Sequence, residues 1–129
     1  MDLAAARGAQ RTVLLPVSGA FHSTLMWPAA EGLAEALEKL TFNRPRVSII
    51  GNVGARPLDT GEAVKEELLG QLCRCVQWKR SVKYMTASGV SSFVEFGPGR
   101  VLSGLVKRID RAPQVTTVND LVSIEALGL

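Results

Sequence analysis

The only histidine in the 129-residue sequence, His22, lies between an apolar run at residues 13–17 and an amphipathic pattern that begins near Pro28. Small residues follow the apolar run, and Ser23 or Thr24 is suited to cap the helix predicted next. A side chain at such a strand-to-helix turn can project from the edge of a sheet into a crevice. A neutral imidazole there can accept a proton from a hydroxyl nucleophile at physiological pH. The alternative is an ordinary loop histidine that serves as a surface or packing residue.

The elements that must position His22 alternate along the chain. Spacing predicts the tail of a helix that stops at Gly8, and Asp59 with Glu62 resembles a capping pair for a later helix. Strands are predicted at residues 11–17, 47–50, 91–96 and 115–118, and helices at about 28–40, 59–72, 76–85, 101–111 and 120–127. Alternating strands and helices indicate an α/β fold whose parallel sheet is covered on both faces.

Composition narrows the classes of function. The chain is 47% hydrophobic and 21% charged, with a net charge of +3, which is typical of a globular domain. No apolar run reaches the ~18 residues that span a bilayer, and no export signal is present, so we expect a cytoplasmic protein that binds no membrane. Basic clusters at residues 79–83 and 107–111 are too sparse to indicate nucleic-acid binding. They are suited to an acidic protein partner or to coenzyme phosphates.

Other candidates are ambiguous when taken alone. Asn52 follows a predicted buried strand, where ligands gather in α/β sheets, but asparagine is also a common turn residue. Residues 97–99 (GPG) precede a helix without matching a phosphate-binding fingerprint, so a tight turn is the better interpretation. Trp78 is expected to anchor the core. Cys73 and Cys75 lack the spacing and partners of a metal site and are expected to be reduced thiols.

Four segments, taken together and in order, resemble the malonyl-CoA:acyl carrier protein transacylases, members of the acyltransferase family of fatty acid and polyketide synthesis. They are residues 16–23 (PVSGAFHS), 47–53 (VSIIGNV), 71–78 (QLCRCVQW) and 93–102 (FVEFGPGRVL). The resemblance extends from about Ala4 to the C-terminus. It departs from the family at Cys75, where proline is usual.

The resemblance implies the C-terminal part of a parallel-sheet, α/β-hydrolase-like acyltransferase core. Residues 1–15 are then expected to be the end of a small ferredoxin-like subdomain. Residues 16–129 are expected to form the C-terminal part of the catalytic core. The chain would thus be one portion of a longer enzyme.

The resemblance also implies roles for individual residues. His22 would be the catalytic base, and the backbone carbonyl of Gln71 would orient its ring. Phe21 would line the malonyl pocket and disfavour an α-methyl branch, and Asn52 would lie near the substrate-binding site. The implied reaction is ping-pong: malonyl moves from coenzyme A to a serine and then to the phosphopantetheine thiol of acyl carrier protein. It needs no metal and no cofactor besides these substrates.

The sequence lacks the Gly-His-Ser-x-Gly elbow that carries the nucleophile in this family. The expected partners are therefore acyl carrier protein, a coenzyme A thioester and the missing N-terminal half of the enzyme. We expect the chain alone to be inactive, because catalytic residues act as a unit. The alternative is a non-catalytic, carrier-protein-binding or scaffold domain of the same fold. A further alternative, ranked last, is a hydrolase that uses Ser23 beside His22.

Overall fold

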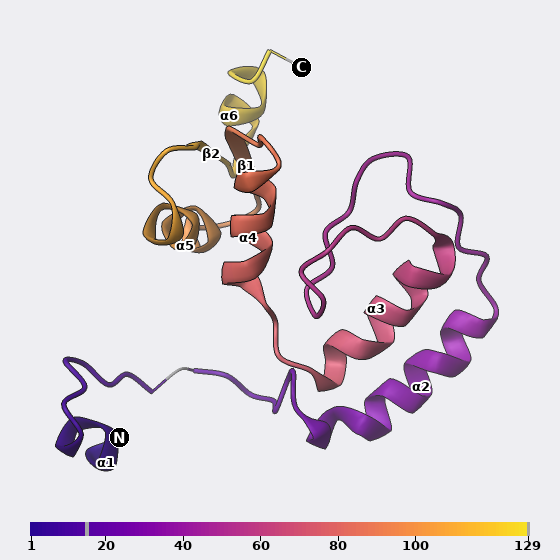
Figure 1. Cartoon of the computed structure of the whole chain (residues 1–129), viewed down its shortest axis with the longest axis horizontal. Coiled ribbons are helices and arrows are strands. Elements are labelled where there is room, and N and C mark those ends of the chain that lie inside the picture. The colour runs from indigo at the N-terminus through magenta and orange to yellow at the C-terminus, as the bar shows by residue number, and fades with distance from the viewer. Residues whose placement is uncertain (15, 129) are drawn as a thin grey trace.

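The computed structural model describes residues 1–14 and 16–128, and its helices and strands pack in two groups (Figure 1). Helix α1 (Asp2–Ala6) lies apart from both groups and ends where Gly8 adopts a φ of 88°, as the sequence predicts. The strand predicted over residues 11–17 is wrong, since the described residues of this segment form no strand. Leu15 lies outside the described residues. A strand is stable only when neighbouring strands bind its backbone, and no other described strand lies against this segment.

The first group contains a 3₁₀ turn, η1 (Thr24–Met26), and helices α2 (Trp27–Glu38) and α3 (Gly61–Cys73), which lie side by side. Pro28 occupies the first turn of α2, as expected. The predicted cap at Ser23 or Thr24 is wrong, because no side chain caps α2. The cap of α3 is Thr60, not Asp59: its Oγ1 accepts a hydrogen bond from Ala63 N at 3.1 Å.

The segment between α2 and α3 forms a hairpin-like loop. Here the strand predicted at residues 47–50 is wrong: the loop holds one antiparallel bridge, between Ile50 and Pro57. The loop is closed by Leu58 N, which donates to Ile49 O at 2.9 Å. Ala55 is buried at the loop's tip with a φ of 53°.

The second group contains α4 (Trp78–Ala87), β1 (Ser92–Phe96), α5 (Val101–Ile109), β2 (Gln114–Val118) and α6 (Leu121–Glu125). Strands β1 and β2 pair in parallel, in a register that sets Ser92 opposite Gln114 and Phe96 opposite Val118. This confirms the predicted α/β class and parallel pairing. Helix α5 packs on both strands, α4 packs on α5, and α6 contacts β2 (Figure 1).

One expectation about this sheet is wrong. Helices do not cover both faces within the described residues, because Val94 and Phe96 on one face of β1 are 42% and 68% exposed. The buried side chains of the group are few, and Val82 on α4 is completely enclosed. Trp78, predicted to anchor this core, is half-buried, and its indole nitrogen is buried without a hydrogen-bond partner among the described residues.

The turn between β1 and α5 is built around Glu95. Gly97 and Gly99 adopt φ values of 125° and 92°, which only glycine tolerates without strain. The Glu95 carboxylate accepts hydrogen bonds from Leu102 N at 3.0 Å and Ser103 N at 2.8 Å, and also from the Ser103 hydroxyl. These amides at the start of α5 are thus already bound to Glu95. This supports the interpretation as a tight turn rather than as a phosphate-binding site. The hydrogen bonds, chiefly from the Ser103 side chain, lower the pKa of Glu95.

The accessible surface of the described structure is 10084 Å². A compact protein of 13.8 kDa exposes about 6,600 Å². The chain therefore exposes about one and a half times the surface expected for a compact domain of its mass. Within residues 1–14 and 16–128, every helix is too short or too polar to cross a bilayer.

Candidate functional site

His22 lies in the segment that leads from the extended N-terminal region into η1. Its backbone has a φ of 61°, a left-handed conformation that is uncommon for residues other than glycine and is often found at functional sites. The turn is closed by the Ser23 hydroxyl, which donates to Ala20 O at 2.6 Å. The Ser23 hydroxyl is thus bound to a backbone oxygen, and the imidazole is bound elsewhere, which disfavours the Ser23 hydrolase.

The ring of His22 is held by the end of α3: its Nδ1 lies 2.6 Å from the backbone oxygen of Gln71. Gln71 is in the last turn of α3, where carbonyl groups have no partner within the helix. A carbonyl oxygen can only accept a hydrogen bond, so Nδ1 must carry the proton. In the neutral ring, Nε2 is then an unprotonated acceptor, which is the state that a general base requires.

The structure brings a third predicted residue to the same place. Asn52 Nδ2 donates to the side-chain oxygen of Gln71 at 3.0 Å, and Asn52 O accepts from Gln77 N at 2.7 Å. Gln71 therefore connects His22, through its backbone oxygen, with Asn52, through its side chain. No local sequence pattern predicts the Asn52–Gln71 hydrogen bond.

Phe21 is adjacent to His22 but is not part of this hydrogen-bonded group. Its side chain is 59% exposed, and its ring lies over Gly19. A Cβ atom added to Gly19 would lie 2.7 Å from Phe21 Cε2, so the absence of a side chain at Gly19 makes room for the ring.

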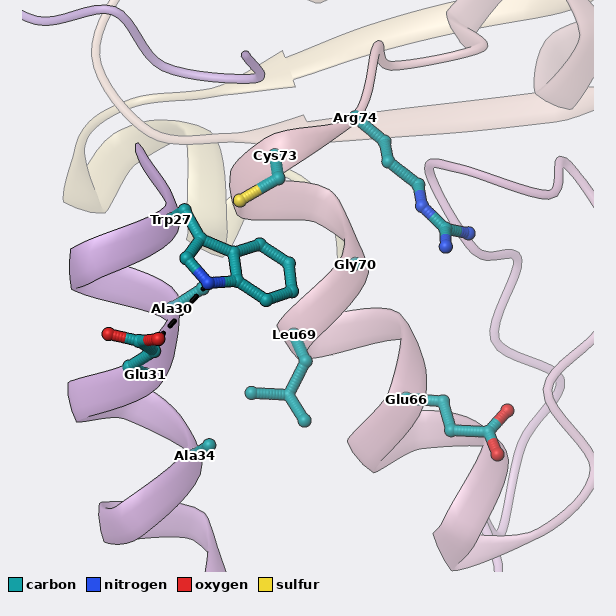
Figure 2. A pocket seen from close by; sticks show the side chains of 9 residues that line it. All are labelled: Trp27, Ala30, Glu31, Ala34, Glu66, Leu69, Gly70, Cys73 and Arg74. Atoms are coloured by element: carbon teal, nitrogen blue, oxygen red, sulfur yellow. Dashed lines mark hydrogen bonds between the residues drawn. The ribbon is translucent and has the colours of Figure 1, made fainter. Parts of the chain in front are cut away.

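Near this group, a cavity of about 440 Å³ lies between α2 and α3 (Figure 2). Trp27 stands at its mouth, 61% exposed, and its Nε1 donates to Glu31 Oε1 at 3.1 Å. Leu69 and the thiol of Cys73 also line it, whereas the Arg74 side chain extends away from α2 (Figure 2). Sequence reasoning missed Trp27; the Trp–Glu spacing of four residues was the available signal.

Cys73 and Cys75 are both free in the structure. In the described part of the chain, no group of three or more His, Cys, Asp and Glu side chains is arranged to hold a metal ion.

No protein-family model matches the chain, but curated and solved proteins do. Malonyl CoA-acyl carrier protein transacylase of Escherichia coli (strain K12) is 45% identical over 115 residues, which make up 89% of this chain and 37% of that protein. The protein of the same name from Bacillus subtilis (strain 168) is 43% identical over 124 residues, 96% of this chain and 39% of that protein.

Solved structures agree with these sequence matches. The crystal structure of an acyl carrier protein S-malonyltransferase from Vibrio cholerae superposes with a TM-score of 0.90 at 40% identity, covering 98% of this chain and 41% of that one. Another, a type II PKS acyl-carrier protein in complex with its malonyl-transacylase, gives a TM-score of 0.90 at 39% identity, over 97% of this chain and 40% of that one.

These structures show that the fold of the chain is that of part of an α/β acyltransferase. More specifically, the chain is homologous to the malonyl CoA-acyl carrier protein transacylases. It spans about two fifths of the length of the relatives that it matches.

Proposed function

We propose that this chain is the histidine-bearing C-terminal portion of a malonyl-CoA:acyl carrier protein transacylase, with His22 as its catalytic base. The observation that carries the proposal is the 2.6 Å contact between His22 Nδ1 and Gln71 O, in a chain homologous to these enzymes. This contact orients the ring much as an aspartate orients the histidine of a serine-protease triad. The backbone carbonyl supplies the hydrogen bond without adding a negative charge.

In the first half-reaction, Nε2 of His22 takes the proton of a serine hydroxyl supplied by the remainder of the enzyme. The serine oxygen attacks the thioester carbon of malonyl-CoA, and the carbon–sulfur bond breaks. The imidazolium then returns the proton to the thiolate of coenzyme A. The enzyme is left as a malonyl-serine ester with a neutral histidine.

In the second half-reaction, Nε2 takes the proton from the phosphopantetheine thiol of acyl carrier protein. The resulting thiolate attacks the malonyl ester, the bond from carbon to the serine oxygen breaks, and the proton returns to that oxygen. The same ring acts as base and then as acid in both halves. Phe21 is predicted to lie against the malonyl group during both steps, and Asn52 is predicted to lie near the substrate-binding site.

A basic surface on the second group of elements supports acyl carrier protein as partner. Residues 79–111 carry seven Lys and Arg side chains, all exposed, against two acidic residues, Glu95 and Asp110. Among these, Lys107, Arg108 and Arg111 lie together beside Pro113. Such a surface attracts an acidic carrier protein by long-range electrostatics.

The test is reconstitution. The chain is mixed with the N-terminal portion of a homologous transacylase, and malonyl transfer from malonyl-CoA to holo acyl carrier protein is measured. Transfer is expected from the mixture and not from the chain alone. His22→Ala in the mixture should lower kcat/KM at least about 100-fold, because a positioned general base contributes that much or more. Ser48→Ala, on an exposed loop, is the control and should retain full activity.

Two outcomes would contradict the proposal. Malonyl transfer by the purified chain alone, above that of His22→Ala, would show a nucleophile within this sequence. Binding of the carrier protein without transfer in the reconstituted mixture would favour the alternative, a non-catalytic scaffold domain.

A further inference from the structure

Asn52 lies in the loop at which the two groups of elements meet. The loop is held in shape by Gly51 N, which donates to Arg56 O at 3.0 Å, and by Val53 N, which donates to Glu67 Oε1 on α3 at 2.8 Å. A Cβ atom on Gly51 would lie 2.6 Å from Glu67 Oε2, so the loop and α3 are in close contact. Asn52 therefore lies between two residues whose backbone amides are both held by hydrogen bonds.

From this position Asn52 binds both ends of the connection between α3 and α4. Its side-chain nitrogen binds the Gln71 side chain at 3.0 Å, and its backbone oxygen binds Gln77 N, immediately before α4, at 2.7 Å. The residue whose side chain it binds is the one whose backbone oxygen binds His22. Movement of Gln71 would shift the acceptor that holds the imidazole.

We propose that Asn52 is a positioning residue: by holding Gln71, it keeps the Gln71 carbonyl against Nδ1 and so selects the tautomer of His22 whose Nε2 is free to act as base. The proposal rests on the proposed function only in the use made of Nε2. The tautomer itself is a property of this chain. The proposal also differs from a substrate-binding role, because the amide nitrogen of Asn52 is bound to Gln71 and not directed to a ligand.

The single histidine makes the test direct, since its ring nitrogens are the only imidazole ¹⁵N signals of the chain. Long-range ¹H–¹⁵N spectra of the full chain report which ring nitrogen carries the proton in the neutral form. Two variants break the same hydrogen bond from opposite ends: Asn52→Leu removes the donor, and Gln71→Met removes the acceptor but leaves the backbone carbonyl. Asn43→Leu, the same change at an exposed loop position, is the matched control.

In the unsubstituted chain and in Asn43→Leu, the proton is expected on Nδ1. In Asn52→Leu and Gln71→Met, Gln71 is no longer held and its carbonyl moves away from Nδ1. The ratio of the Nδ1–H to the Nε2–H tautomer should then fall about fivefold, the effect of losing one ordinary hydrogen bond. Asn52→Asp should restore the ratio, because the Gln71 amide can rotate and donate its NH₂ group to the new carboxylate. Should Asn52→Leu fail to fold, Gln71→Met alone decides, since it leaves the loop unchanged.

An unchanged tautomer ratio in folded Gln71→Met would overturn the positioning role. In the reconstituted enzyme, a positioning role predicts a lower kcat for Asn52→Leu, whereas contact with substrate predicts a higher KM and an unaltered tautomer. Failure of the proposed function would look different. Malonyl transfer would then be insensitive to His22→Ala, while the tautomer would still respond to Asn52.

Discussion

At the scale of single residues, the unusual backbone of His22 and the bare Cα of Gly19 belong to one turn. The left-handed φ of His22 and the ring of Phe21 over Gly19 together set the directions of two neighbouring side chains. The imidazole contacts the backbone oxygen of Gln71, and the phenyl ring lies over Gly19. A short segment thus separates the predicted base from the predicted pocket wall.

Phe21 allows a prediction about substrate selection. If its ring limits the space beside the α-carbon of the acyl group, Phe21→Ser should raise kcat/KM for methylmalonyl-CoA relative to malonyl-CoA by about tenfold or more, since one methyl group in a pocket is worth that much discrimination. The ratio is measured with both thioesters competing for the reconstituted enzyme. An unaltered ratio with normal malonyl transfer would exclude Phe21 from the pocket.

At the scale of elements, Glu95 links β1 to the first turn of α5. Its folded-state pKa is lowered, so its contribution to stability is present above the ordinary glutamate pKa of about 4.3 and is lost as the pH falls through that value towards the lower folded-state pKa. The Glu95→Gln variant should therefore unfold at lower urea than the unsubstituted chain at pH 7, and the gap should narrow as the pH falls below the ordinary glutamate pKa. Asp120, whose pKa is also lowered by Ser123, titrates in both proteins and cancels in this comparison.

A gap that stays constant with pH would show that the negative charge of Glu95 does not stabilise α5.

The start of α3 gives a second prediction at this scale. A Cβ atom on Gly61 would overlap the backbone oxygen of Phe42, which cannot move aside as a flexible side chain could, so Gly61→Ala should lower the free energy of unfolding strongly. Gly32→Ala in α2 is the matched control: nothing lies within 4 Å of its Cβ position, and the change should stabilise by about 0.5–1 kcal/mol. Both are measured by urea unfolding. Equal effects of the two changes would contradict the close packing at Gly61.

The predictions made from the sequence can be compared with the structure element by element. Patterns with local causes were predicted well: the apolar spacing of α2 to α5 and the parallel orientation of β1 and β2, which only α5 separates. The strands predicted at residues 11–17 and 47–50 were wrong, because β-branched residues indicate a strand only where a neighbouring strand binds the backbone. The cap at Thr60 was misplaced by one residue.

In the candidate site, too, some features were predicted from the sequence and others were not. Motif resemblance pointed to His22 and to the Gln71 carbonyl, and the structure places these two groups 2.6 Å apart. Their catalytic roles stay predictions. The Asn52–Gln71 hydrogen bond and the Trp27 cavity depend on side-chain packing between segments distant in sequence, which no local pattern reports.

At the scale of the whole molecule, the uncovered surface is the dominant feature. Large apolar side chains are exposed on several elements, among them Phe96, Val101, Leu121 and Val122. Exposed apolar side chains of this size can mediate association with other protein surfaces. We therefore expect the purified chain to bind a hydrophobic dye or to self-associate, and to lose both properties when the N-terminal portion of a homologous transacylase is added.

The measurement is dye fluorescence together with light scattering, with and without the added portion. A monodisperse monomer that does not bind the dye would contradict this expectation.

The parallel pair β1–β2 has a consequence for the order of folding. Its strands are separated by one helix, so the unit closes over a short stretch of chain and is expected to form early. The contact of His22 with Gln71 spans 49 residues and forms only when α3 is complete. During synthesis, the imidazole leaves the ribosome long before its acceptor does, and we expect their contact to form only after α2 and α3 have docked.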